Sequence, residues 1–357
     1  RLSPSPQTVP ASGGPWLSDR YRFFFPEKYK LSRTAPAFQA RLPQNKNRKS
    51  ASHMRPEMKH ACRILIFLLG VAAFMAGSEP ARARTVTDQL GRQVVIPDAP
   101  ARIVSLAPSI TEIIFELKCN DRLKGVTRFS DYPAAAAALP RVGSYVHLDL
   151  EKIVALKPDL CIAVKDGNPI EIVRRLELIG IPVYAVDPRN LDTVIETVRE
   201  IGRLLNTRAR AEQVVRDMAD RVGRVKRLVA SSDRRPGVFF QIGISPIVSV
   251  GSNTFNHELI QLAGGRNLVR GPAAYPRFSK EQVLALAPEV IIICSMARQG
   301  GFERMKAEWN RWTGLPAVRD RRIFLVDSNL FNRPTPRLVD GLELLFELIH
   351  PELAEEN

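Results

Sequence analysis

Apolar and polar residues alternate in blocks from about Arg102 to the C-terminus, and these blocks predict strands followed by helices. Short runs rich in Val and Ile are typical of buried parallel strands, whereas the segments between them carry apolar residues at helical spacing. We interpret the blocks as βαβ units and expect an α/β fold. The strand-like runs are RIVSLA, DLCIAV, IPVYAVD, GVFFQIG, PIVSVG, EVIIICS and RIFLVD.

The helix after the first strand is predicted to begin at a capping box. Ser109 is the expected N-cap residue, and Glu112 follows it by three positions, which is the spacing of a capping box.

A stretch without strand-like runs, residues 191–230, separates two groups of strands. Its second half places apolar residues on one face at helical spacing and predicts a helix over about 207–230. Such a helix is long enough to cross between two lobes as a rigid strut; the alternative is a surface helix within one lobe. The residues of the predicted apolar face are Val214, Met218, Val222, Val225 and Val229.

A segment that begins at Tyr145 recurs in similar form from Tyr275. YVHLDLEKIVALKPD occupies residues 145–159, and YPRFSKEQVLALAPE occupies residues 275–289. Each copy has an aromatic residue, a polar helix cap, an acid two residues later, an apolar helical stripe and a proline before a buried strand. A unit that occurs twice predicts two lobes of similar fold, and paired lobes commonly hold a ligand between them.

Two shorter matches suggest how the strands of the lobes correspond. IVS at Ile103 recurs at Ile247, and the run from Pro182 resembles the run from Arg322. We therefore expect two similar α/β lobes with mainly parallel sheets, at residues 84–206 and 231–357, joined by a long rigid interdomain helix at residues 207–230.

The net charge of +15 is concentrated before the predicted fold. Residues 1–83 hold 14 Lys or Arg against 4 Asp or Glu, which leaves 38 against 33 for the rest of the chain. A nearly balanced folded part does not indicate a nucleic-acid partner.

Residues 58–83 have the pattern of a secretory signal peptide. A basic start, MKHACR, is followed by an apolar run of about 14 residues and a small-x-small end at Ala83. A membrane anchor is the alternative, but a spanning helix needs about 20 apolar residues. We expect cleavage after Ala83 and a periplasmic protein. Residues 1–57, which do not begin with Met, are interpreted as a disordered or mis-extended leader.

Motifs of catalysis and metal binding are missing from the sequence. It has no GxSxG, GxxxxGK[ST] or HExxH motif, and GxGxxG does not follow the first strand. The histidines after the signal segment, His147, His257 and His350, are not at zinc-ligand spacing. Cys161 and Cys294 lie inside apolar strands and are expected to be buried free thiols. We expect no enzyme, no metal site built by the protein and no resident cofactor.

Two kinds of side chain remain as candidates for binding. Glu151 and Glu281 occupy the first turn of the two repeated helices, where they either stabilise the helix dipole or dock a basic partner. Aromatic and polar residues that follow predicted strands are either packing residues or the lining of a cleft for a large, flat, partly polar molecule. These are Phe129, Tyr132, Tyr145, Tyr275, Phe331 and Arg333.

From about Val94 onward the chain resembles the periplasmic substrate-binding proteins of the helical-backbone class. This class serves ABC importers of vitamin B12, iron siderophores and haem, and its cobalamin-binding branch is the most similar. The resemblance covers both lobes. The motifs that carry it are RIVSLAPSITEIIFEL, GVTRFSDYP, LEKIVALKPDL, FSKEQVLALAPEVIII and LFNRPTPRLVDGLELL.

The resemblance implies a role for several residues. An acid on each lobe, Glu151 and Glu281, would pair with arginines of a dimeric ABC permease. The ligand would lie between the lobes against Phe129, Tyr145 and Tyr275, and against a polar stretch that runs from Asn329 to Arg333. We expect a monomeric, non-catalytic receptor that delivers a small-molecule chelate to the permease.

Two departures from the cobalamin relatives leave the ligand open. Those relatives carry tryptophan where this chain has Tyr145 and Tyr275, and an acid near Asn329 or Asn332. A cobalt corrinoid such as vitamin B12 is the first hypothesis, and haem or a ferric siderophore is the alternative, since a tyrosine can ligate haem iron. Two rival hypotheses are an exported α/β enzyme acting on a chelate or cofactor, and a sensory receptor whose partner is a signalling membrane protein.

Overall fold

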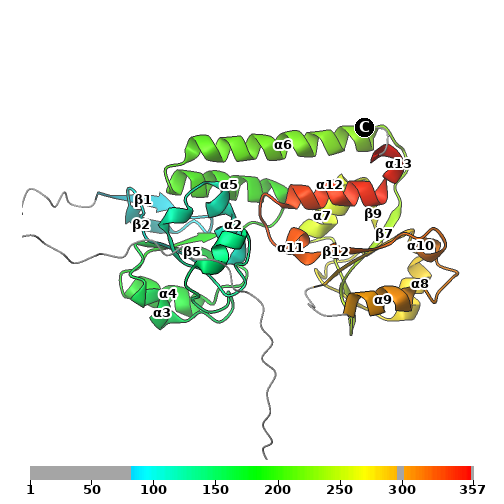
Figure 1. Ribbon diagram of the computed structural model, residues 1–357, viewed down its shortest axis with the longest axis horizontal. Helices are drawn as coiled ribbons and strands as arrows, with labels where there is room; N and C mark the ends of the chain where they lie inside the picture. The colour runs from blue at the N-terminus through cyan, green and yellow to red at the C-terminus, as the bar shows by residue number, and fades with distance from the viewer. Residues whose placement is uncertain (1–81, 296–300, 355–357) are drawn as a thin grey trace, which may run out of the picture. The chain divides into compact units, whose positions relative to one another are not determined.

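The computed structural model describes residues 82–295 and 301–354, which all belong to one compact unit, Val71–Asn357. Two α/β lobes and one long helix form this part of the chain (Figure 1). The prediction of an α/β protein with two lobes is confirmed. The predicted leader, residues 1–57, lies outside the described residues, as does the predicted signal peptide apart from Arg82 and Ala83.

A parallel sheet of four strands, in the order β4-β3-β5-β6, forms the centre of the N-terminal lobe. Its strands are β3 (Ile103–Ser105), β4 (Leu123–Gly125), β5 (Leu160–Val164) and β6 (Val183–Val186). Its helices are α2 (Pro108–Glu116), α3 (Leu150–Ala155), α4 (Ile170–Leu178) and α5 (Leu191–Leu204), with 3-10 turns at Asn120–Arg122 and Ala134–Ala138. An antiparallel hairpin of β1 (Ala83–Thr87) and β2 (Gln93–Pro97) precedes them.

The sheet of the C-terminal lobe is mixed, in the order β10-β8-β7-β11-β12, with β9 also paired to β7. The strands β7, β11 and β12 are parallel, whereas β8 returns antiparallel beside β7. The strands are β7 (Gly237–Gly243), β8 (Ile247–Ser249), β9 (Arg266–Asn267), β10 (Arg277–Phe278), β11 (Val290–Ser295) and β12 (Ile323–Asp327). The helices are α7 (Phe255–Leu262), α8 (Lys280–Leu286), α9 (Gly301–Trp309), α10 (Pro316–Arg319), α11 (Ser328–Phe331), α12 (Leu338–Ile349) and α13 (Pro351–Ala354).

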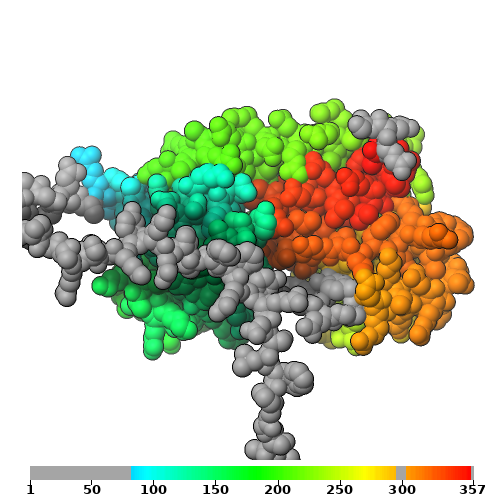
Figure 2. Space-filling model, in the orientation of Figure 1, coloured from blue at the N-terminus to red at the C-terminus, as the bar shows by residue number. Residues whose placement is uncertain are grey.

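The helix between the lobes, α6, extends over Arg208–Ala230. All five residues of the predicted apolar face are buried, and the helix packs against α5 of one lobe and against α12 of the other. Figure 2 shows the opposite side of α6 at the surface. The amphipathic pattern of this helix is therefore explained by two lobes that share its buried face.

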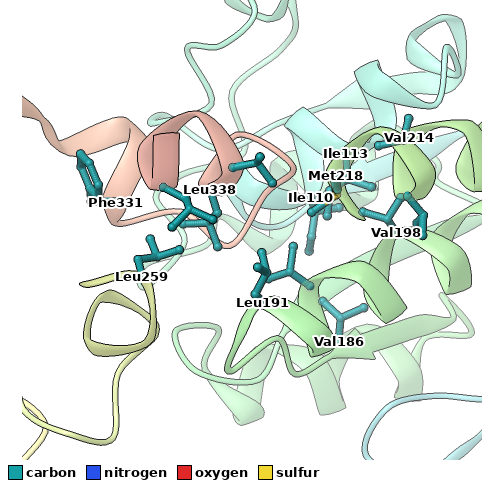
Figure 3. Packing of buried hydrophobic residues seen from close by; sticks show 14 of the residues in the cluster. Ile110, Ile113, Val186, Leu191, Val198, Val214, Met218, Leu259, Phe331 and Leu338 are labelled. Atoms are coloured by element: carbon teal, nitrogen blue, oxygen red, sulfur yellow. The ribbon is translucent and has the colours of Figure 1, made fainter. Parts of the chain in front are cut away.

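One continuous hydrophobic cluster connects α2 and α5 of the N-terminal lobe, α6, and α7 and α12 of the C-terminal lobe. Ile113, Val198, Met218 and Leu338 belong to it (Figure 3). A second cluster in each lobe covers the other face of the sheet, beneath α3 in one lobe and α8 in the other. Both sheets are thus buried on both faces, as the continuous apolar runs of their strands predict.

The repeated segment adopts the same structure in both lobes. Asp149 caps α3 and Ser279 caps α8, each by accepting a hydrogen bond from a backbone N–H three residues later. The acid that ends each copy then ties it to the first strand of its sheet: Asp159 accepts from Arg102 N at 2.9 Å, and Glu289 accepts from Gly237 N at 2.8 Å. The repeat pattern did not predict this role for Asp159 and Glu289.

The shorter matches have different outcomes. β6 and β12 both lie parallel to the strand that follows the repeat, so the match of the runs from Pro182 and Arg322 is confirmed. The match of Ile103 with Ile247 is wrong, because β3 and β7 are the strands paired to the repeat strands, and Ile247 lies on an antiparallel strand. Three apolar residues are too little to identify a strand.

The predicted capping box at Ser109 is also wrong. The N-cap of α2 lies two residues earlier, at Ala107, which makes no side-chain hydrogen bond, and the helix begins at Pro108. Proline suits the first helical position because its missing N–H has no partner there in any case. Glu112 is therefore not a capping residue, and its side chain is buried.

Candidate ligand-binding site and docking residues

A loop after β4, residues 127–133, carries Phe129 and Tyr132 and is called the aromatic loop below. Buried hydroxyl groups hold its backbone in place: Ser130 accepts from Thr111 Oγ1 at 3.0 Å and lies 2.9 Å from the hydroxyl of Thr127. Arg141 donates to the carbonyl oxygens of Thr127 and Ser130. The two rings remain exposed, so a fixed backbone presents them at the surface.

Tyr145 lies beside the aromatic loop at the start of the first repeat. Its ring meets the ring of Phe129 edge to face, with centroids 6.5 Å apart. Asn168 donates to the carbonyl oxygen of Tyr145 at 2.7 Å, and a Cβ on Gly167 would lie 2.7 Å from the Tyr145 ring. Glycine at position 167, with φ of +139°, thus leaves the room that this ring occupies.

Tyr275, the equivalent residue of the second repeat, is 55% exposed on the C-terminal lobe. Partial desolvation raises the pKa of its hydroxyl, and the charge of Asp166 adds to the rise. Asp166 follows β5 of the N-terminal lobe and is two residues before Asn168, which holds Tyr145. The loop after β5 thus contacts Tyr145, and its Asp166 acts on Tyr275 through its charge.

The polar stretch after β12 has mixed positions. Asn329 is half-buried in α11, where its N–H donates to Asp327 at 2.9 Å. Phe331 is 0% exposed and packs edge to face on Phe240 of the core. The prediction of Phe331 as a ligand-contacting residue is not supported, because its ring fills the core beneath α12 rather than lining a surface. An aromatic residue in a turn-rich segment does not reveal on which side of the turn its ring lies.

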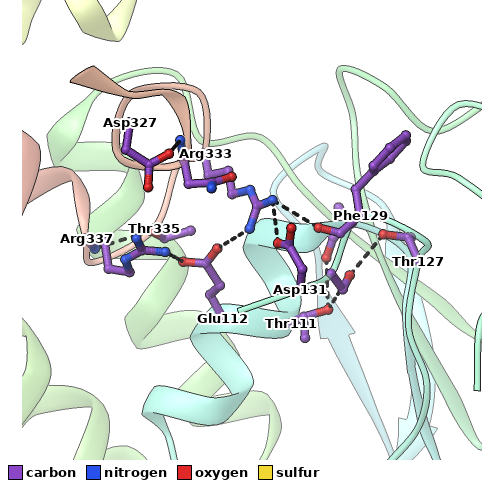
Figure 4. A network of polar contacts seen from close by, with 12 residues as sticks. Thr111, Glu112, Thr127, Phe129, Asp131, Asp327, Arg333, Thr335 and Arg337 are labelled. Carbon is purple, nitrogen blue, oxygen red and sulfur yellow. Dashed lines mark hydrogen bonds and ion pairs between the residues drawn. The ribbon is translucent and has the colours of Figure 1, made fainter. Parts of the chain in front are cut away.

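Arg333 reaches across to the N-terminal lobe, where it contacts α2 and the aromatic loop (Figure 4). It donates to Glu112 at 2.8 Å, to Asp131 at 2.8 Å and to the carbonyl oxygen of Phe129 at 3.0 Å. Arg337 lies 3.4 Å from the other carboxylate oxygen of Glu112, and its guanidinium stacks 3.8 Å from the centre of the Tyr132 ring. We call Glu112, Asp131, Arg333 and Arg337 the interlobe cluster.

The interlobe cluster pairs two acids with two arginines, and the carboxylate of one acid, Glu112, is buried. The Glu112 side chain is 2% exposed, and burial raises its pKa although both arginines act in the opposite direction. A buried carboxylate is stable only when it is paired and hydrogen-bonded. The sequence contains a sign of this: Glu112 stands among the apolar residues of SITEIIFEL, so a helix buried there would need a cationic partner for it.

Glu151 and Glu281 are exposed in equivalent first turns of α3 and α8. Both helices cover the sheet faces that are remote from α6, since the hydrophobic clusters beneath them exclude α6. Hydrogen bonds from Ser279 and from the Glu281 backbone lower the pKa of Glu281 and favour its negative form. The two acids are thus presented on corresponding surfaces of the two lobes.

Cys119, Cys161 and Cys294 are buried and free, and burial raises the pKa of Cys161 and of Cys294 to about 12. The prediction of buried thiols in the strands is confirmed. Within residues 82–295 and 301–354, no three His, Cys, Asp or Glu side chains gather as a group able to hold a metal ion. The same residues contain no helix that is both long and apolar enough to cross a membrane.

Comparison with known proteins gives a family match over residues 103–330, to the periplasmic binding proteins. Among curated proteins, the vitamin B12-binding protein of Vibrio parahaemolyticus is 31% identical over 242 residues, which are 68% of this chain and 86% of that protein.

Solved structures share the arrangement of the lobes. The periplasmic vitamin B12 binding protein BtuF of Vibrio cholerae is 29% identical with a TM-score of 0.63, over 73% of this chain and 100% of that one. A periplasmic haem-binding protein from Pseudomonas aeruginosa is also 29% identical, with a TM-score of 0.64 over 71% of this chain and 93% of that one.

Proposed function

The chain belongs to the periplasmic binding protein family, and from this premise we propose that it captures a corrinoid between its two lobes for uptake by an ABC importer. Binding proteins of this family work with ABC transporter permeases and are not enzymes. The similarity to a vitamin B12-binding protein over both lobes is the observation that carries the choice of ligand.

The side chains available at the lobes suit such a ligand. Phe129, Tyr132 and Tyr145 supply aromatic surface from the N-terminal lobe, and Tyr275 supplies it from the C-terminal lobe. Asn329 adds an amide that can donate and accept hydrogen bonds. Large apolar surface with a few polar groups is what a macrocycle with amide side chains requires. The corrinoid is cargo, so the protein itself needs no resident cofactor.

Haem is a second candidate ligand because one of the similar structures is that of a haem-binding protein. The tyrosines at positions 145 and 275 replace the tryptophans expected in cobalamin relatives, and a phenol can ligate haem iron where an indole cannot. A ferric siderophore is a weaker candidate, since no observation on this chain favours it.

Titration of the purified protein with cyanocobalamin, dicyanocobinamide and haemin distinguishes these ligands. We expect saturable heat release and a change in the corrin absorbance bands with the two corrinoids. A Soret-band shift with haemin, without binding of either corrinoid, would show that the ligand is haem and not a corrinoid. Binding of none of the three would contradict the proposed function.

Delivery to the permease is assigned to Glu151 and Glu281, one acid on each lobe. Arginines on two permease subunits would pair with them, and such charge pairing sets the orientation of a complex more than its affinity. We propose that the binding protein acts as a monomer, since the two lobes of one chain already present two equivalent acids.

We further propose that the protein is exported by a signal peptide, residues 58–83. Its removal after Ala83 would leave Arg84 as the first residue. Intact mass measurement of the protein from a periplasmic extract checks this, and a mass that includes residues before Arg84 would contradict it.

A further inference from the structure

We propose that Glu112 is a positioning residue: it anchors Arg333 and Arg337 of the C-terminal lobe, and these two arginines set the aromatic loop of the N-terminal lobe in place for the ligand. The part of this inference that concerns the ligand rests on the proposed function.

Each arginine holds one aromatic residue of the loop. Arg333 donates to the backbone oxygen of Phe129, while the Phe129 ring points away from the guanidinium (Figure 4). Arg337 stacks on the ring of Tyr132 at 3.8 Å. Both contacts are made by residues of the opposite lobe, so the N-terminal lobe alone does not complete its own aromatic surface.

Glu112 is the group that the two arginines share. Its two carboxylate oxygens face different guanidinium groups, at 2.8 Å for Arg333 and 3.4 Å for Arg337. Asp131, which belongs to the aromatic loop itself, takes the second bond of Arg333. A planar guanidinium donates in fixed directions, so anchoring one edge to Glu112 fixes where its other donors point.

The arrangement gives Glu112 a role that differs from that of a ligand contact. The side chain is buried and is paired with Arg333 and Arg337, so its effect on the ligand passes through these two arginines. Arg333, which was predicted to contact the ligand, makes these contacts within the protein. Preorganisation of this kind increases affinity by removing the cost of ordering a loop during binding.

The test uses Glu112→Gln, which keeps the size of the side chain and removes its charge. Full-length protein containing 3-fluorotyrosine reports the Tyr132 ring by fluorine NMR without ligand, with Tyr132→Phe assigning the signal. We expect Glu112→Gln to move the Tyr132 resonance and to raise the dissociation constant for cyanocobalamin about tenfold. Arg337→Leu should move the same resonance, and it keeps the test valid if Glu112→Gln fails to fold.

Asp88→Asn is the matched control. Asp88 is also a buried carboxylate paired with an arginine, Arg92, but its hydrogen bonds and its ion pair are made to residues of the N-terminal lobe. It should lower stability while leaving the Tyr132 resonance and the dissociation constant unchanged.

An unmoved Tyr132 resonance in both Glu112→Gln and Arg337→Leu would overturn the inference, whatever happened to affinity. The proposed function fails separately, if wild-type protein binds none of the three probe ligands. The NMR measurement still decides the positioning role in that case, because it needs no ligand.

Discussion

At the residue scale, the repeat tyrosines and Glu112 contribute in different ways. Tyr145 and Tyr275 offer ring surface, and their exposed or half-buried positions mean that little of the core depends on them. Glu112 is buried and paired, so its removal alters the positions of other groups. Side chains of the first kind are expected to govern affinity directly, and those of the second kind indirectly.

Replacing both Tyr145 and Tyr275 by Ala should weaken cyanocobalamin binding by about tenfold or more, since an aromatic contact contributes about 0.5 to 1.5 kcal/mol beyond its buried area. Calorimetric titration measures the effect, and circular dichroism verifies that the fold is kept. Trp312→Ala is the control, because it removes another exposed ring of the C-terminal lobe that is not among the predicted contacts. Equal affinity in the double variant and the wild type would show that the two tyrosines do not contribute to ligand binding.

At the element scale, the two copies of the repeat show how far sequence patterns reach. The strands, the repeated helices with their caps, and the apolar face of α6 follow from periodicity and local chemistry, which act over a few residues. Ser109 and Glu112 have the spacing of a capping box, yet the helix begins at Pro108. The Glu112 carboxylate instead accepts a hydrogen bond from Arg333, which lies 221 positions away in the chain. The burial of Phe331 could not be predicted for the same reason, because it depends on Phe240 in a distant strand.

The helices α3 and α8 supply the test of permease docking. Charge reversal of both acids, Glu151→Lys with Glu281→Lys, should leave ligand affinity unchanged and abolish most uptake, because repulsion replaces pairing with permease arginines. Uptake of labelled cobalamin by cells and titration of the purified variant measure the two effects separately. The control is Glu171→Lys with Glu303→Lys, which reverses one exposed first-turn acid on another helix of each lobe. Normal uptake by the Glu151 and Glu281 variant would rule out their docking role.

The contact between α6 and α12 predicts a pH dependence of stability. Arg221 of α6 donates to Glu343 of α12 at 3.0 Å, and this hydrogen bond lowers the pKa of Glu343 although burial opposes it. A lowered pKa means that the folded state binds the proton less tightly than the unfolded state. The stabilisation is therefore present above the ordinary glutamate pKa of 4.5 and is lost as the pH falls through the lower, folded-state value.

Glu343→Gln should accordingly lower the free energy of unfolding by about 1 kcal/mol at pH 7, with the difference from wild type shrinking below about pH 4.5. Urea denaturation across this pH range measures the difference. Glu347→Gln changes an exposed acid one turn later on α12 that makes no ion pair within the part of the chain that the structure describes, and it should have little effect at any pH. A difference that grew on acidification would show that the sign is wrong.

At the scale of the whole molecule, the lobes are connected at several levels. They share α6 and one hydrophobic cluster, and polar contacts add the interlobe cluster and a hydrogen bond from Leu191 N to Glu258 at 2.8 Å. Large hinge motions need a few flexible linking residues, whereas a packed helix resists them. This arrangement favours a receptor that binds its ligand with little closure.

Spin labels on α4 and α9 test this expectation, with Arg174→Cys and Ala307→Cys as exposed labelling sites and Cys62→Ser to avoid a further label. The mean distance between the labels should change by less than about 2 Å when cyanocobalamin is added. The three cysteines of the lobes are buried and are expected to stay unlabelled. A shift of many ångströms would indicate a hinged receptor instead.

The separation of Glu112 from Arg333 in the chain also affects the order in which their contacts form during synthesis. Glu112 and the aromatic loop are synthesised early, whereas Arg333 follows 221 residues later. Contacts between distant residues form late, because the chain between them must first be ordered. A nascent chain that ended after α6 would contain every residue of the aromatic loop but neither Arg333 nor Arg337. Under the proposed positioning role of Glu112, the aromatic loop would gain its contacts with Arg333 and Arg337 only after the C-terminal lobe has folded.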